Sequence, residues 1–213
     1  MTTTTNDARF WDRASEKYAK SKIKDEAGYE RTLSRTDALL KPDDRVLELG
    51  CGTGTTALGL ASKAGSYLAT DISPAMIAIA EKKEQANPVA SLTFRTATAE
   101  RLAEEGARFD AVLGFNYLHL VRDLPGTLHA IHGLLAQDGL FISKTPCLGD
   151  MNPLIRLVML PVMRVIGLAP TVNIFDAAGL ERRIRAAGFE IVARESHASK
   201  GKDTRPFIVA RRK

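Results

Sequence analysis

Hydrophobic residues occur along the chain as short runs, and most runs are followed by a segment with helical spacing. The apolar runs that predict strands are residues 45–49, 67–70, 92–96, 109–115 and 139–143. The segments that predict helices between them are residues 55–64, 74–87, a short stretch near Glu100 and residues 124–135. Strands that alternate with helices form βαβ units, which build a parallel sheet covered on both faces. The pattern therefore predicts a doubly wound α/β fold.

The N-terminal part precedes this alternation. After a disordered start, helices are predicted over residues 10–23 and 29–40. In the second helix, Leu33, Leu39 and Leu40 are the residues that we expect to be buried.

The C-terminal part begins with an apolar insert at residues 152–170. A helix at residues 177–187 follows, and then strands at 189–195 and 207–210, joined by a polar loop. We expect one domain over residues 1–213. Its predicted subdivisions are an N-terminal helical cover at 9–41 and an apolar helical insert at 147–175.

Composition supports one globular domain. The chain has 213 residues, of which 45% are hydrophobic and 26% charged, and these values exclude wholesale disorder, collagen-like repeats and a disulfide scaffold. Cys51 and Cys147 are far apart and lack the spacing of a metal site, so no metal and no disulfide is expected. The polar N-terminus lacks the apolar region of a secretory signal, and residues 154–169 are too short and too interrupted to span a bilayer. We expect a cytoplasmic protein.

The net charge of +5 is confined to the C-terminus. Seven of the 30 basic residues and two of the 25 acidic residues lie in residues 194–213, which accounts for the whole excess. We expect this segment at an edge of the sheet, where charge discourages pairing between molecules. Weak contact with an anionic membrane surface stays open as an alternative. A nucleic-acid partner is not favoured, because the rest of the chain is balanced.

A glycine-rich loop follows the first predicted strand. Residues 48–54 read Glu-Leu-Gly-Cys-Gly-Thr-Gly, and glycines here allow a ligand to approach the backbone at the start of a helix. Asp71 ends the second strand, where a carboxylate can bind both hydroxyls of a ribose. This arrangement predicts a nucleoside-containing cofactor. Thr55 stands where a dinucleotide fingerprint needs glycine or alanine, which weakens the NAD(P)-dependent oxidoreductase alternative, and the lysine of a P-loop is missing.

The loop at residues 46–54, together with Asp71-Ile72-Ser73-Pro74-Ala75-Met76, resembles the class I S-adenosylmethionine-dependent methyltransferases. Their hallmark is an acid, then G-x-G-x-G, then an acid that ends the second strand. Residues 109–112 and 179–189 resemble later segments of the same family, and the resemblance covers about residues 9–213. It implies a seven-stranded, mostly parallel sheet with an antiparallel last strand, and S-adenosyl-L-methionine as the cofactor, with S-adenosyl-L-homocysteine as its product.

The resemblance also implies a set of cofactor-binding residues. Gly50, Gly52 and Gly54 would lie against the methionyl part, Glu48 would orient its amino end directly or through water, and Asp71 would bind the ribose. The remaining implied members are Cys51 as a space filler, Ile72, Met76, Thr98, Ala99 and Glu100 around the adenine, Phe115 and Asn116 near the sulfur, and Trp11 and Tyr18 as a cover. Thr98 departs from the Asp that relatives usually carry, and the backbone of Ala99 could serve instead.

Methyl transfer from a sulfonium is an in-line displacement, so the protein mainly positions the acceptor and excludes water. If the acceptor is a hydroxyl or an ammonium, a base must remove a proton, and His119 and Tyr117 are the catalytic candidates. A packed histidine at the start of a helical connection is the alternative for His119, and His129 and His132 are expected at the surface or in packing.

The acceptor is expected to be a small hydrophobic or amphiphilic molecule, either lipid-like or aromatic. The apolar insert would form a pocket wall, a dimer surface or additional core, and monomer and homodimer both stay open. Arg156 and Arg164 would either hold an acidic substrate group or line an exposed helix edge. Residues 114–117 lack the signature of the DNA amino-methyltransferases. A cofactor-binding or regulatory module without methylation activity is the rival function.

Overall fold

The computed structural model describes residues 3–152, 172–201 and 204–213, and the strands in this part form one seven-stranded sheet. The order across the sheet is β3-β2-β1-β4-β5-β7-β6. The strands are β1 (Arg45–Leu49), β2 (Ser66–Asp71), β3 (Leu92–Thr96), β4 (Phe109–Phe115), β5 (Leu135–Lys144), β6 (Phe189–Glu195) and β7 (Phe207–Arg212). The pairs among β1 to β5 are parallel, whereas β7 runs antiparallel to both β5 and β6. The predicted fold class is confirmed.

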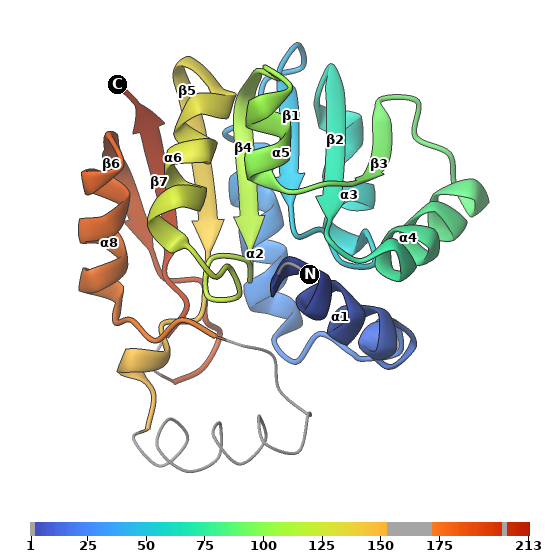
Figure 1. Cartoon of the computed structure of the whole chain (residues 1–213), viewed down its shortest axis with the longest axis horizontal. Helices are drawn as coiled ribbons and strands as arrows, with labels where there is room; N and C mark the ends of the chain where they lie inside the picture. Colours follow the sequence, from blue (N-terminus) through green and yellow to red (C-terminus); the bar gives the residue numbers. More distant parts are fainter. Residues whose placement is uncertain (1–2, 153–171, 202–203) are drawn as a thin grey trace.

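Helices cover both faces of the sheet (Figure 1). They are α1 (Thr3–Ala19), α2 (Glu26–Asp37), α3 (Thr55–Leu60), α4 (Pro74–Ala86), α5 (Ala99–Glu104), α6 (Leu124–Leu134) and α8 (Ala177–Ala186), with the short 3-10 turns η1 (Ala61–Lys63) and η2 (Leu148–Asp150). Several begin at the expected kind of residue: the Ser73 hydroxyl accepts from the Met76 N–H, with Pro74 in the first turn of α4.

The core is double because the strands are buried on both faces. On one face, strand residues such as Leu47 and Phe141 pack with α5, α6 and α8, and on the other, residues such as Val46 and Ile142 pack with α3 and α4. Neighbouring strand residues therefore serve opposite layers. This arrangement explains why the strands read as continuous apolar runs instead of alternating ones.

The N-terminal helices differ from the sequence prediction. Helix α1 already begins at Thr3, so the expected disordered start is wrong, and it ends at Ala19 instead of residue 23. Local propensity gave no signal for this start, because the contacts that hold α1 come from distant residues. Helix α2 buries Gly28, Thr32 and Thr36, while the three predicted leucines are only partly buried. Its innermost face meets polar partners, which hydrophobic spacing cannot reveal.

Some predictions fall on residues outside the described part. The insert, with Arg156 and Arg164, lies almost wholly in residues 153–171, so its helical character stays a prediction. No helix within the described ranges is both long and apolar enough to cross a membrane. The same ranges contain no cluster of His, Cys, Asp or Glu that could hold a metal ion. The cytoplasmic location stays a prediction.

The basic C-terminal segment lies only partly at the sheet edge. Strand β6 is the edge strand, whereas β7 is enclosed between β5 and β6. The expectation of an edge position is therefore right for β6 and wrong for β7, since the antiparallel return places the last strand inside the sheet.

Candidate active site

A cavity of about 500 Å³ lies at the carboxyl ends of β1, β2 and β4. Most of the predicted site residues meet on its wall. These are Trp11, Tyr18, Gly50, Gly52, Asp71, Ile72, Met76, Thr98, Glu100, Phe115, Asn116, Tyr117 and His119. Glu48, Cys51, Gly54 and Ala99 are buried and do not line the cavity. The position agrees with the general rule that open α/β sheets bind ligands at the carboxyl ends of their strands.

The glycine loop divides between the cavity and the core. Gly50 has φ of 69°, and a Cβ built on it would lie 2.8 Å from the Tyr117 ring, so the backbone and this ring meet only because the side chain is absent. Gly54 also has positive φ, but its Cβ would meet Ala80 and Phe94 at about 2.8 and 2.9 Å. Gly54 therefore permits packing against α4 and β3. Cys51 is buried beneath the loop, and burial raises the pKa of its thiol, which argues against a nucleophile.

Asp71 is oriented by the backbone before any ligand binds. Its Oδ2 accepts from the Gly52 N–H at 3.0 Å, and its Oδ1 accepts from the Ser73 N–H at 2.9 Å. Burial raises the pKa of this carboxyl, and the backbone donors oppose that rise. Each oxygen can accept a further hydrogen bond. A ribose with two neighbouring hydroxyls matches this pair of acceptors.

Glu48 lies in β1, two residues before the first glycine of the loop. It is only 3% exposed, and its Oε2 accepts from the Tyr67 hydroxyl at 2.8 Å beneath the loop. Burial raises the pKa of Glu48 to about 7. The described structure thus shows Glu48 as a support of the loop, and its contact with the amino end of a cofactor stays a prediction.

The adenine end of the predicted site lies at the start of α5. Thr98 is the N-cap of this helix and accepts from the Arg101 N–H, so the threonine that replaces the usual Asp still has a structural role. Ala97 lines the cavity, whereas Ala99 is fully buried behind it. Glu100 is held by the Thr127 hydroxyl, which donates at 2.6 Å.

Helix α1 covers the cavity from below the strands as drawn in Figure 1. Trp11 and Tyr18 form an edge-to-face pair with ring centres 6.2 Å apart. Arg122, after β4, donates through Nε and Nη2 to both oxygens of Asp7 at 2.6 and 2.7 Å. At the other side, the Ser73 hydroxyl donates to Asp12 at 2.6 Å. These two contacts fasten α1 across the cavity.

The loop after β4 forms the opposite wall. Asn116 has φ of 52°, a strained value for a residue with a side chain, and its N–H donates to the Lys144 carbonyl at 2.8 Å. Burial raises the pKa of Tyr117, which keeps its phenol protonated. His119 lies in a turn instead of a helix. Its Nδ1 is buried and makes no hydrogen bond in the described structure, and burial lowers its pKa to about 4.

Several residues of the site escaped the sequence prediction. They are Asp7 and Arg122 at the mouth, Lys83, whose ammonium donates to the Thr53 carbonyl and hydroxyl, and Asn173, whose N–H donates to the His119 carbonyl at 2.7 Å. Each acts between segments that are far apart in sequence. A polar residue carries no signal of a distant partner in the sequence, so only the fold reveals these contacts.

A sheet of this order, with a glycine loop and a ribose-type acid at one cavity, defines an α/β protein that binds a nucleoside-containing cofactor. Residues 16–194 match a family model described as a methyltransferase domain. The chain therefore belongs to the class I S-adenosylmethionine-dependent methyltransferase family. The predicted family is confirmed, and with it the enzyme class and the cofactor that the family uses.

Relatives and solved structures differ in what they support. The ubiquinone biosynthesis O-methyltransferase of Methylocella silvestris is 34% identical over 101 residues, which are 47% of this chain and 39% of that protein. The matched part spans about two fifths to a half of the length of the curated relatives. The crystal structure of magnesium protoporphyrin IX methyltransferase from Synechocystis with bound S-adenosylhomocysteine is similar to this chain with a TM-score of 0.73 and 19% identity. The match covers 99% of each chain. The [4+2]-cyclase SpnF has a TM-score of 0.68 at 19% identity, with 85% of this chain and 80% of that chain covered. Structural similarity at 19% identity shows the fold alone.

Proposed function

We propose that this chain transfers a methyl group from S-adenosylmethionine to a hydroxyl of a small, largely apolar acceptor. The observation that carries the proposal is the convergence of the glycine loop, the backbone-held Asp71 and the His119 ring on one cavity, where Nδ1 of this ring has no partner among the described residues. The first two features bind a cofactor, and the third offers a contact to an acceptor. Methyl transfer is the chemistry that such a pair of subsites supports in this family.

The residues present fit an S-adenosyl ligand. Asp71 offers two carboxylate oxygens for the ribose, and Gly50 and Gly52 line the cavity with backbone against which the amino acid part can lie. Ile72 and Met76 offer an apolar surface for the adenine, as the family resemblance implies. Phe115 and Asn116 lie at the end of β4, beyond the glycine loop, where the sulfur would face them.

Bound S-adenosylmethionine supplies a methyl group on a positively charged sulfur, which is already an activated leaving group. The protein therefore needs to align the acceptor and to exclude water. Helix α1 serves the second need, because the Asp7–Arg122 pair and the Asp12–Ser73 contact hold it across the cavity. The turn at Asn116 and Tyr117 serves the first, because it forms the wall beside the donor end.

His119 is the residue that we assign to the acceptor. Its pKa of about 4 keeps the imidazole neutral at neutral pH, so one ring nitrogen is a hydrogen-bond acceptor. A hydroxyl that donates to this nitrogen would be oriented for attack and would lose its proton in that direction. Tyr117 does not suit the role of base, because its phenol stays protonated. Leu120 and Val121 add apolar wall beside His119.

The acceptor class follows from this wall and from the relatives. A hydroxylated aromatic ring combines an apolar body with a polar group that His119 can bind. The curated relatives named as ubiquinone biosynthesis O-methyltransferases support an oxygen acceptor on a quinone-like ring. A lipid-like acceptor would also need an apolar wall and a polar group that binds its hydroxyl.

The test is transfer of labelled methyl from S-adenosylmethionine to a panel of dihydroxylated aromatic acids and phenols. We expect a methyl ether product with the wild type, and a loss of about 100-fold or more in His119→Gln, because a positioned proton acceptor contributes on that scale. His129→Gln, an exposed histidine of α6, is the matched control and should keep full activity. Equal activity in the two variants would remove His119 from the acceptor site, whereas a wild type that binds S-adenosylhomocysteine but transfers no methyl group to the panel would favour the non-catalytic module.

A further inference from the structure

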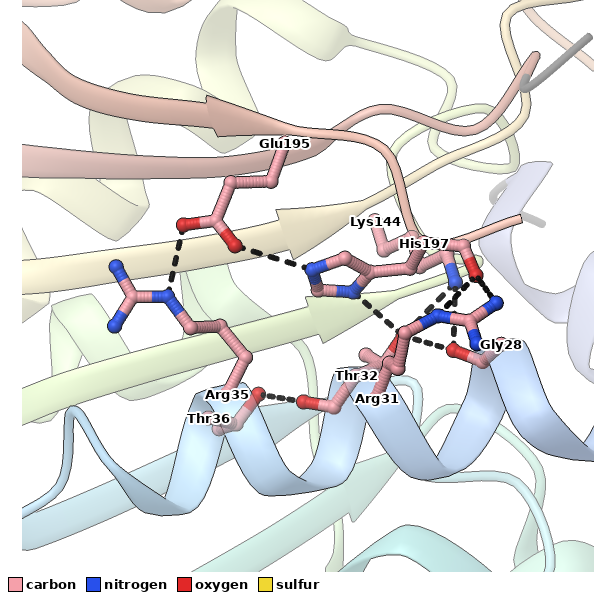
Figure 2. A network of polar contacts seen from close by, with 8 residues as sticks. All are labelled: Gly28, Arg31, Thr32, Arg35, Thr36, Lys144, Glu195 and His197. Atoms are coloured by element: carbon pink, nitrogen blue, oxygen red, sulfur yellow. Dashed lines mark hydrogen bonds and ion pairs between the residues drawn. The ribbon is translucent and has the colours of Figure 1, made fainter. Parts of the chain in front are cut away.

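A polar network joins α2 to the strands at the C-terminal side of the sheet (Figure 2). Its centre is the hydroxyl of Thr32, which is 3% exposed. This oxygen donates to the Gly28 carbonyl at 2.8 Å and accepts from the Lys144 ammonium at 2.8 Å. The Nδ1 atom of His197 lies 3.0 Å from it. A hydroxyl has one hydrogen and two lone pairs, so Thr32 can serve all three partners when His197 donates. We call this centre the Thr32 hub.

Several further contacts hold His197 and the neighbouring end of β6 beside the hub. Arg31 donates through Nε and Nη2 to the His197 carbonyl at 3.2 and 2.7 Å, and Arg35 donates to Glu195 at 2.8 Å. The His197 ring stacks on Phe207 of β7, with centres 4.5 Å apart. A Cβ on Gly28 would lie 2.6 Å from the His197 carbonyl, so this approach requires glycine. The end of β6 is therefore held tightly against α2.

The hub also reaches the cavity through Lys144. This residue ends β5, directly beside Phe115 at the end of β4. Its ammonium lies in the hub, and its carbonyl accepts from the N–H of Asn116 at 2.8 Å. Asn116 is the cavity residue with a positive φ of 52°. A strained backbone conformation persists only where its surroundings hold it, and Lys144 supplies one of these contacts.

We infer that the Thr32 hub positions the Asn116 turn, and that Thr32 and Lys144 are thereby positioning residues for the cofactor pocket. Neither residue lines the cavity. Their effect passes through Lys144, whose backbone pairs with β4 and β7 and whose ammonium donates to the Thr32 hydroxyl and, at 3.3 Å, to the Gly28 carbonyl. This inference rests on the proposed function, because it assigns Asn116 to the S-adenosyl ligand.

Two threonines of α2 provide a matched pair of variants. Thr36 is one turn after Thr32 and fully buried, but its hydroxyl donates to the Thr32 carbonyl within the helix, at 2.8 Å. Thr32→Val and Thr36→Val therefore remove the same atom from similar surroundings, and only the first removes the hub. Thr32→Ser keeps the hydroxyl and serves as the rescue.

The experiment measures S-adenosylhomocysteine affinity by calorimetry and the amide ¹H–¹⁵N resonance of Asn116 in the full chain. We expect Thr32→Val to weaken binding about five-fold, the effect of one disturbed hydrogen-bonded contact, and to shift the Asn116 resonance. Thr36→Val should leave both readouts unchanged even if it lowers the unfolding temperature. Thr32→Ser should restore both.

Equal affinities and equal Asn116 resonances in Thr32→Val and Thr36→Val would overturn the inference, and so would a failure of Thr32→Ser to restore them. If the wild type does not bind S-adenosylhomocysteine, the proposed function fails. The Asn116 resonance of the ligand-free variants then still decides whether the hub positions this turn.

Discussion

The two ends of the cavity are built in different ways. At the cofactor end, the polar groups are already bonded within the protein: Asp71 accepts from two backbone N–H groups, and Lys83 holds the Thr53 side of the glycine loop. At the end that we assign to the acceptor, His119 lines the cavity, and its buried Nδ1 makes no hydrogen bond in the described part of the chain. The polar groups at the cofactor end are thus held in place by the protein itself, whereas the His119 ring has a nitrogen whose hydrogen-bonding capacity is unused among the described residues.

This difference matters because a carboxylate that is already oriented binds a ligand without the free-energy cost of ordering its side chain. An unpaired buried nitrogen carries a desolvation cost that an acceptor hydroxyl would relieve. Variants at the cofactor end should therefore change stability and cofactor affinity. Variants at the acceptor end should change transfer and leave cofactor affinity intact.

The largest effect is expected beneath the cofactor end, at Glu48. Its pKa is raised to about 7 from an ordinary 4.5, so the folded protein favours the neutral acid. The stabilising contribution is fully present below pH 4.5 and is lost as the pH rises towards 7, by up to about 3 kcal/mol. Glu48→Gln is neutral at every pH and retains an acceptor for Tyr67. It should exceed the wild type in unfolding free energy at pH 8 by up to about 3 kcal/mol and match it near pH 4.5.

Chemical denaturation at both pH values measures this difference. Glu190→Gln, an exposed change on β6, is the control and should show no pH-dependent gain. A Glu48→Gln gain of the same size at both pH values would mean that Glu48 is ionised throughout.

The next effect is expected at Asp71. Asp71→Asn replaces one carboxylate oxygen by an amide and removes the charge, so S-adenosylhomocysteine affinity should fall about 30-fold, or about 2 kcal/mol. Asp110→Asn is the control, because Asp110 bonds to Arg45 away from the cavity. Calorimetry gives both values, and unchanged affinity in Asp71→Asn would remove Asp71 from the ribose site.

A smaller effect is expected at the mouth between the two ends. Arg122→Gln breaks the contact with Asp7 on α1, and S-adenosylhomocysteine should dissociate about five-fold faster, the scale of about 1 kcal/mol for a partly exposed bidentate pair. Stopped-flow displacement measures this rate. Arg95→Gln is the control, since it breaks the similar bidentate pair with Glu105 outside the cavity. Equal rates in the two variants would show that α1 does not retain the ligand through Arg122.

The smallest effect on cofactor affinity is expected at the acceptor end. His119→Gln should change S-adenosylhomocysteine affinity by less than about two-fold, because we assign this residue to the acceptor and not to the cofactor. A large loss of affinity would show that His119 contributes to cofactor binding, and the two ends of the cavity would then not differ in function. The measurement is calorimetry at pH 7.5, where the wild-type imidazole is neutral.

Sequence reasoning reached the sheet and most of the cofactor end because both depend on local signals. Apolar runs predicted the strands, and glycines with Asp71 marked the loop where the chain must bend around a ligand. It missed the start of α1 and the buried face of α2, since polar contacts over long sequence distances determine both. Family resemblance named Glu48 as a contact for the amino end of the cofactor, which stays a prediction, but it gave no sign of the hydrogen bond from Tyr67.

Calorimetry of the wild-type chain with S-adenosylhomocysteine and, separately, with NADH shows which cofactor the cavity binds. We expect one molecule of S-adenosylhomocysteine bound per chain and no heat of binding from NADH. Binding of NADH without binding of S-adenosylhomocysteine would contradict this expectation and would favour the oxidoreductase alternative.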